Sequence, residues 1–191
     1  MRVCVFCGSR PGNDPAIGDL AKSLARALVT RGHGIVFGGG SVGLMGILAD
    51  EVMAGGGEVI GVMPKHMVER EIAHTGTELH IVDTMHTRKA LMYDLSDAVI
   101  ALPGGFGTLD ELFEVLTWNQ LGLHAKPAGL LDHNGYFAPL VAFLDGAVAA
   151  GFIAPEHRAL LISDSDADRL LDALGAWKPT RSSKWITAED R

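Results

Sequence analysis

The stretch AVIALPGGFGTLDELFEVL, residues 98–116, holds the pattern on which the fold depends. Five consecutive apolar residues, 98–102, precede a glycine-rich turn, and a segment of helical period follows, which we expect to run from Leu109 to Leu121. A strand that is apolar on both faces is typical of a parallel sheet covered by helices on both sides. The stretch therefore predicts one strand–turn–helix unit of an α/β fold.

The same unit recurs in both directions along the chain, and no linker, repeat or low-complexity segment interrupts it. Because continuous apolar runs alternate with amphipathic stretches, we expect a doubly wound parallel sheet of about seven strands with helices on both faces. The expected strands are 3–6, 34–37, 58–63, 78–82, 98–102, 128–131 and 160–163. The other expected helices are 15–30, 43–54, 85–96, 137–150 and 167–174.

Length and composition predict one globular domain. The chain has 191 residues, of which 48% are hydrophobic and 20% charged, so it can bury one full core. We assign this domain to residues 1–177. The remaining stretch, KPTRSSKWITAEDR (178–191), is polar and lacks a period. It is expected to be a loose tail or an arm on a partner subunit, the latter suggested by Trp185.

Charge and the N-terminal sequence limit the partners and the location. Sixteen Lys and Arg against 23 Asp and Glu give a net charge of −7, which argues against binding a nucleic-acid backbone. The N-terminus MRVCVFCGSR has no basic segment followed by a long apolar one, so no secretory signal is expected. Residues 32–49 are uncharged but too rich in glycine for a membrane span. We expect a soluble, cytoplasmic protein.

Cysteine and histidine give no sign of redox or metal chemistry. Cys4 and Cys7 form a C-x-x-C pattern, but in an extended strand their Cα atoms would stand roughly 10 Å apart. A disulfide needs less than about 7 Å, so buried strand cysteines are the better interpretation. The eight histidines form no H-x-x-x-H or Cys/His cluster, and no metal site is predicted.

Two further glycine clusters follow the second expected strand and helix. Residues 38–43, GGGSVG, match G-x-G-x-x-G, a dinucleotide-binding pattern. However, Glu58, the acid at the expected separation, stands at the beginning of the next strand, whereas a ribose-binding acid belongs at its far end. We favour nucleotide contact over a tight turn that only packs closely. Gly55 to Gly57 follow a helix and are predicted to end it.

The turn PGGFGTLDE, residues 103–111, is the strongest signal. Glycines there let backbone N–H groups converge on an anion, and the following helix N-terminus adds partial positive charge. Thr108 can add a hydroxyl donor, so a phosphate would fit. Thr108 and Glu111 also form T-x-x-E, a capping box that would explain both residues without chemistry. A carboxylate beside a phosphate site is electrostatically unfavourable unless it has a function, so we favour a catalytic role for Glu111.

A second segment with candidate site residues, MHTRK (residues 85–89), lies at the start of the expected helix 85–96. Arg88 and Lys89 oppose the helix dipole there, which suggests a nearby anion. The alternative is a solvated basic pair answered by Asp83 or Asp94.

Together, CGSR (7–10), GGGSVGLMG (38–46), MHTRK and PGGFGTLDE resemble the lonely guy (LOG) family, once labelled possible lysine decarboxylases. The resemblance covers roughly residues 1–177. It implies a Rossmann-like fold, a homodimer, and hydrolysis of the N-glycosidic bond of adenine-type nucleoside 5′-monophosphates, including cytokinin ribotides. The family's catalytic arginine and glutamate fall on Arg88 and Glu111. Thr87 departs from the usual M-H-E-R-K form.

The resemblance implies an enzyme that needs no cofactor. Decarboxylation would require a lysine Schiff base with pyridoxal phosphate, and Lys89 is better explained by phosphate. The expected substrate contacts are Gly104, Gly105, Gly107 and Thr108 with the 5′-phosphate, Ser9, Gly39, Gly40 and Gly43 with ribose or base, and Met85 with the purine. The main alternative is a non-hydrolytic carrier of a nucleotide or molybdenum cofactor on the same fold. A nicotinamide-dependent oxidoreductase is a weaker one.

Overall fold

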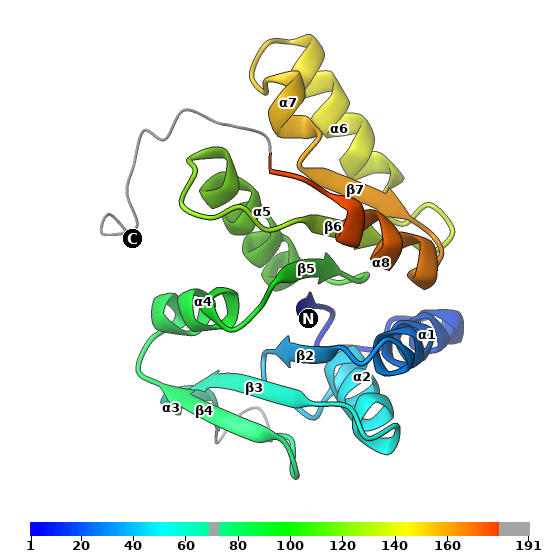
Figure 1. Ribbon diagram of the computed structural model, residues 1–191, viewed down its shortest axis with the longest axis vertical. Helices are drawn as coiled ribbons and strands as arrows, with labels where there is room; N and C mark the ends of the chain where they lie inside the picture. The colour runs from blue at the N-terminus through cyan, green and yellow to red at the C-terminus, as the bar shows by residue number, and fades with distance from the viewer. Residues whose placement is uncertain (69–72, 180–191) are drawn as a thin grey trace.

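The computed structural model describes residues 1–68 and 73–179. Its centre is a seven-stranded parallel sheet in the order β4-β3-β2-β1-β5-β6-β7 (Figure 1). The strands are β1 (Arg2–Phe6), β2 (Gly34–Phe37), β3 (Val59–Pro64), β4 (Glu78–Val82), β5 (Ala98–Ala101), β6 (Ala128–Leu131) and β7 (Leu161–Asp164). The predicted fold class, α/β with a doubly wound parallel sheet, is confirmed.

The strand order reverses at β1. The chain proceeds from β1 outward to β4 on one side, returns, and places β5 against the other side of β1, with Phe6 opposite Ala101. The segments that follow these two strands therefore run side by side. Leu102 N–H donates to the Phe6 carbonyl at 2.9 Å, and Gly8 N–H donates to the Pro103 carbonyl at 3.1 Å. Ligands of open α/β sheets bind at such a switch point, outside the carboxyl ends of the strands.

Helices cover both faces of the sheet (Figure 1). Alternate residues of β1 divide between two cores, with Val3 and Val5 in one and Cys4 and Phe6 in the other. Core residues of α1, α2 and α8 pack on the first face, and those of α4, α5 and α6 on the second. These helices are α1 (Pro15–Thr30), α2 (Gly43–Ala54), α4 (Met85–Asp94), α5 (Phe106–Gln120), α6 (Ala138–Ala149) and α8 (Ala167–Ala176).

The predicted helix after β5 begins too late. The sequence suggested a start at Leu109, whereas α5 begins at Phe106, inside the glycine-rich motif. Glycine disfavours helix, so the pattern of apolar residues becomes visible only after Gly107. Two helices of four residues, α3 (Lys65–Val68) and α7 (Pro155–Arg158), were not predicted because one turn shows no period.

The structure also tests the smaller predictions about glycine and cysteine. Gly55 is the C-cap of α2 and Gly56 has φ of 76°, so the predicted helix stop is confirmed. Cys4 is buried in β1, Cys7 lies one residue past it, and both are free thiols. Burial raises the pKa of both groups. The interpretation as buried strand cysteines therefore holds for Cys4, whereas Cys7 is partly exposed just past the strand.

The C-terminal prediction falls mostly beyond what the structure covers. The last described helix, α8, ends at Ala176. Residues 180–191 of the predicted tail, with Trp185 among them, lie outside the described residues. Within residues 1–68 and 73–179, no helix is both long and apolar enough to cross a membrane.

Candidate active site

A cavity of about 290 Å³ opens where the segments after β1 and β5 meet the first turns of α4 and α5. Seven of the predicted site residues line it: Ser9, Met85, Arg88, Gly105, Gly107, Thr108 and Glu111. All four sequence motifs thus meet in this cavity, since Met45 of GGGSVGLMG also lines it. A larger cavity of about 620 Å³ lies at the amino ends of the strands, beside the ion pair of Arg2 and Glu58. It is remote from these motifs.

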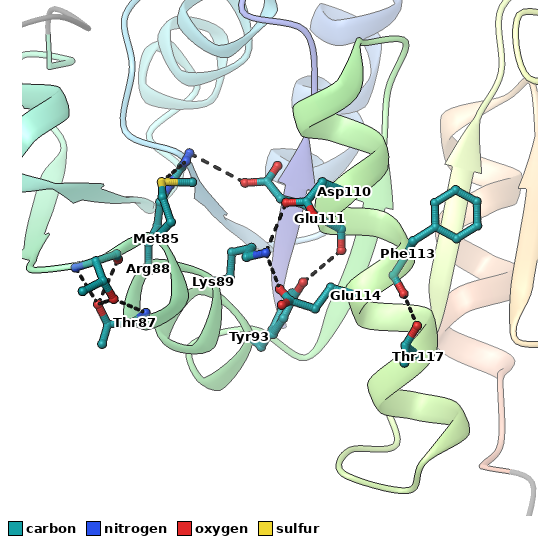
Figure 2. Close-up of polar contacts among 11 residues, drawn as sticks. Met85, Thr87, Arg88, Lys89, Tyr93, Asp110, Glu111, Phe113, Glu114 and Thr117 are labelled. Carbon is teal, nitrogen blue, oxygen red and sulfur yellow. Dashed lines mark hydrogen bonds and ion pairs between the residues drawn. The ribbon is translucent and has the colours of Figure 1, made fainter. Parts of the chain in front are cut away.

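Arg88 reaches this cavity from the first turn of α4 (Figure 2). It is 7% exposed, its Nε donates to the Val62 carbonyl at 3.1 Å, and its Nη1 lies 3.8 Å from the Met85 sulfur. The Nη2 atom lies 3.8 Å from Oε1 of Glu111. The alternative of a solvated basic pair is therefore wrong, because Arg88 is buried and Asp83 instead pairs with Lys65 at 2.7 Å.

Glu111 projects into the cavity from the second turn of α5. Its side chain is 12% exposed. Burial raises the pKa of this carboxyl to about 7, although the positive charge of Arg88 lowers it. A group that titrates near neutral pH can both accept and release a proton during turnover. The pair of Arg88 and Glu111 therefore combines a fixed positive charge with a proton acceptor.

The capping-box explanation of Thr108 and Glu111 is wrong. The N-cap of α5 is Gly105, so both residues lie inside the helix. The N-cap residue is a glycine and has no side chain that could cap this end, and the amides of the first turn have no acceptor within the helix. These N–H groups and the helix dipole suit an anion.

Close packing explains a glycine just before this helix. A Cβ on Gly104 would stand 2.8 Å from Cβ of Thr108 and 2.9 Å from the Gly8 nitrogen, so a larger residue would push the loop apart. Gly104 itself lines a neighbouring cavity of about 310 Å³, which also touches Ser9 and Gly105.

Lys89 is turned away from the cavity. Its ammonium lies 3.1 Å from Asp110 and 3.1 Å from Glu114, both on α5 (Figure 2). Burial lowers the pKa of Lys89, but these contacts outweigh it and leave the pKa above its usual value. Successive helix residues point about 100° apart, so when Arg88 faces the cavity its neighbour faces α5. The structure thus gives Lys89 two carboxylate partners in place of the predicted phosphate contact.

The glycines after β2 serve packing. Gly39 and Gly43 have φ of 80° and 61°, which favours glycine. A Cβ on Gly43 would overlap the backbone of Ser9, and one on Gly38 would overlap the Arg88 guanidinium. Among the described residues that line the active-site cavity, Gly39, Gly40 and Gly43 do not appear. The left-handed backbone accounts for glycine at positions 39 and 43, whereas contact of Gly39, Gly40 and Gly43 with ribose or base stays a prediction.

Several residues of the site were not predicted. Met45, Met67 and Phe106 line the cavity, and Phe106 is 95% exposed. Tyr93 supports α5 from behind, since its hydroxyl donates to the Glu111 carbonyl at 2.9 Å and its ring packs edge-on against Trp118. Met45 and Phe106 stand within the quoted motifs and could have been noticed. Met67 and Tyr93 lie on α3 and α4, whose placement the sequence does not reveal.

Solved structures share this fold at low sequence identity. A molybdenum cofactor carrier protein from Chlamydomonas reinhardtii has a TM-score of 0.68 at 20% identity, covering 91% of this chain and 95% of that one. A molybdenum cofactor binding protein from Rippkaea orientalis has a TM-score of 0.66 at 21% identity, covering 92% and 95%. At such identities the likeness shows the fold alone.

Sequence comparison is more specific. Residues 45–174 match a family model described as "Possible lysine decarboxylase". A protein of Oryza sativa subsp. japonica named as a probable cytokinin riboside 5′-monophosphate phosphoribohydrolase is 51% identical, covering 93% of this chain and 85% of its own. An Arabidopsis thaliana cytokinin riboside 5′-monophosphate phosphoribohydrolase is 50% identical, covering 93% and 84%. The chain therefore belongs to the LOG family, that of the cytokinin riboside 5′-monophosphate phosphoribohydrolases.

Proposed function

We propose that this protein hydrolyses the N-glycosidic bond of adenine-type nucleoside 5′-monophosphates, AMP or cytokinin ribotides, to the free base and ribose 5-phosphate. The observation that carries the proposal is Glu111, a buried carboxyl with a pKa of about 7, facing Arg88 in a cavity that opens at an uncapped helix N-terminus. Two relatives that are 51% and 50% identical are named as a probable and an assigned phosphoribohydrolase. The decarboxylase description gains no support from Lys89, which stays protonated between two carboxylates.

The 5′-phosphate would bind at the start of α5. Gly105, Gly107 and Thr108 line the cavity there, so we assign their amides and the Thr108 hydroxyl as phosphate donors, and the helix dipole favours the negative charge. Binding energy from this remote group would hold the ribose in place for reaction. Met85, which touches Arg88 and lines the same cavity, would form an apolar wall for the purine.

Cleavage of the glycosidic bond proceeds through a transition state in which the ribose carbon C1′ becomes positive. The ionised Glu111 would stabilise this charge and accept a proton from the attacking water. The water oxygen bonds to C1′, the bond from C1′ to the base breaks, and the proton ends on the departing base. A guanidinium does not readily release a proton in proteins, so Arg88 acts by charge and hydrogen bonding.

The test is incubation with AMP and with isopentenyl-AMP, followed by chromatography of the free base. Glu111→Gln should keep mononucleotide binding and lose at least about 100-fold in turnover. The matched control is Glu51→Gln, which removes a carboxylate paired with Arg26 between α1 and α2. Full activity in Glu111→Gln would refute the catalytic role. Tight binding of AMP by the unaltered protein without release of adenine would favour the carrier alternative.

Two further predictions concern the setting of this activity. The ratio of rates on AMP and isopentenyl-AMP would separate nucleotide salvage from hormone activation. We also propose a homodimer in the cytoplasm, for which light scattering of the purified protein and localisation of a tagged copy are the direct measurements.

A further inference from the structure

The loop after β6 reaches the proposed phosphate loop from the side. Because β6 lies beside β5 and parallel to it, the segments that follow the two strands both begin at the carboxyl ends of the strands. Tyr136, in the loop between β6 and α6, donates its hydroxyl to the carbonyl of Gly104 at 2.5 Å. No motif of the sequence analysis includes this tyrosine.

The loop that carries Tyr136 is tightly built. The carboxylate of Asp132 accepts hydrogen bonds from the amides of Gly135 at 3.0 Å and Phe137 at 2.8 Å. Asn134, between Asp132 and Gly135, has φ of 50°, an uncommon value for a residue other than glycine. The tyrosine ring also packs edge-on against that of Phe137, with centroids 5.0 Å apart. Strained backbone of this kind persists where the surroundings fix it, and here it presents one hydroxyl to one carbonyl.

That hydrogen bond sets the direction of the next amide. The peptide between Gly104 and Gly105 is planar and trans, so its N–H points opposite to its carbonyl. The carbonyl points to Tyr136, which lines the neighbouring cavity of about 310 Å³. Gly105 lines that cavity and the active-site cavity, whereas Tyr136 lines the first of the two. The peptide between Gly104 and Gly105 therefore lies between the two cavities, and its carbonyl faces Tyr136.

A peptide between two glycines turns easily, because neither residue has a Cβ to restrict it. We propose that Tyr136 is a positioning residue for phosphate recognition: its hydroxyl holds the Gly104 carbonyl, so that the Gly105 amide points at the 5′-phosphate. The inference rests on the proposed function, since it takes a nucleoside 5′-monophosphate as the ligand. Adenosine, which lacks the phosphate, should not depend on this tyrosine.

The experiment compares AMP with adenosine by calorimetry in the Glu111→Gln background, where turnover should be at least about 100-fold slower. Adding Tyr136→Phe should weaken AMP binding about tenfold, as expected for one hydrogen bond to a charged group, and leave adenosine binding unchanged. The matched control is Tyr93→Phe, which removes the hydroxyl bonded to the Glu111 carbonyl. It should leave the ratio of AMP to adenosine affinity unaltered. Tyr136 is 48% exposed, so the melting temperature of its Phe variant should stay within a few degrees of the parent.

Equal losses for AMP and adenosine, or no loss for either, would overturn the role of Tyr136. So would a parent protein that binds both ligands equally. Release of adenine by the unaltered protein is measured separately. If the unaltered protein releases adenine but Tyr136→Phe keeps the ratio of AMP to adenosine affinity, the positioning role alone is refuted. If Tyr136→Phe lowers that ratio but the unaltered protein releases no adenine, the proposed activity alone is refuted.

Discussion

Replacing Glu111 with glutamine should make the protein more stable at alkaline pH. Folding raises the pKa of this carboxyl from 4.5 to about 7, mainly by burial. Between these two values the unfolded chain releases the Glu111 proton while the folded protein keeps it. Unfolding therefore releases a proton, and the free energy of unfolding falls as the pH rises.

The size of the effect follows from the difference in pKa. At about 1.36 kcal/mol for each pH unit, the full penalty amounts to about 3 kcal/mol above pH 7. Glutamine has nearly the same shape and never ionises, so the variant escapes the penalty. The attraction between the ionised carboxylate and Arg88, 3.8 Å away, already contributes to the pKa of about 7, so loss of this charge adds no separate cost.

Urea unfolding at about pH 5 and about pH 8 measures the two free energies for the parent and for Glu111→Gln. Relative to the parent, the variant should gain about 2 to 3 kcal/mol between these pH values, and all other titrations cancel in the comparison. The control Glu51→Gln removes a carboxylate that lies 2.6 Å from Arg26 between α1 and α2, and it should not reproduce this gain. A constant difference between parent and Glu111→Gln across this range would refute the buried, proton-retaining state of the carboxyl.

Three further changes follow from the same geometry. The rate of base release should rise with pH through about 7 as Glu111 ionises, and Arg88→Met, which removes the charge that lowers this pKa, should move the midpoint of the rate profile to higher pH. Lys89→Met leaves two carboxylates without their shared cation, one of them exposed, so urea unfolding should show a loss of about 2 kcal/mol, below the range for fully buried pairs. Gly43→Ala places a methyl group against the Ser9 backbone at φ of 61°, and thermal unfolding should report a destabilisation of at least about 1 kcal/mol.

Local patterns predicted the elements and the fold class. Apolar runs such as 98–102 and the helical period of 15–30 reflect contacts within a few residues, and both appear in the structure as β5 and α1. The helix stop at Gly55 is equally local. The start of α5 was missed because its first turn contains Gly107, whose weak helix preference hid it.

Side-chain partners depend on strand order and helix phase, which no local pattern contains. Lys89 follows Arg88 directly in the sequence, yet Lys89 pairs with Asp110 whereas Arg88 lines the cavity. The glycines after β2 match a nucleotide-binding pattern, yet Gly38 packs against Arg88 and Gly43 against the loop after β1. Tyr136 meets Gly104 across 32 positions only because β6 lies next to β5.

The alternation of buried strands and helices could be predicted from the chain alone, and its motifs indicated the family and the proposed catalytic pair of Arg88 and Glu111. The tertiary structure decided what surrounds that pair. Burial, which the sequence does not state, brings the pKa of Glu111 to about 7. The physical reason is that hydrophobic period is a property of neighbouring residues, whereas desolvation and charge act through space between elements far apart in the chain.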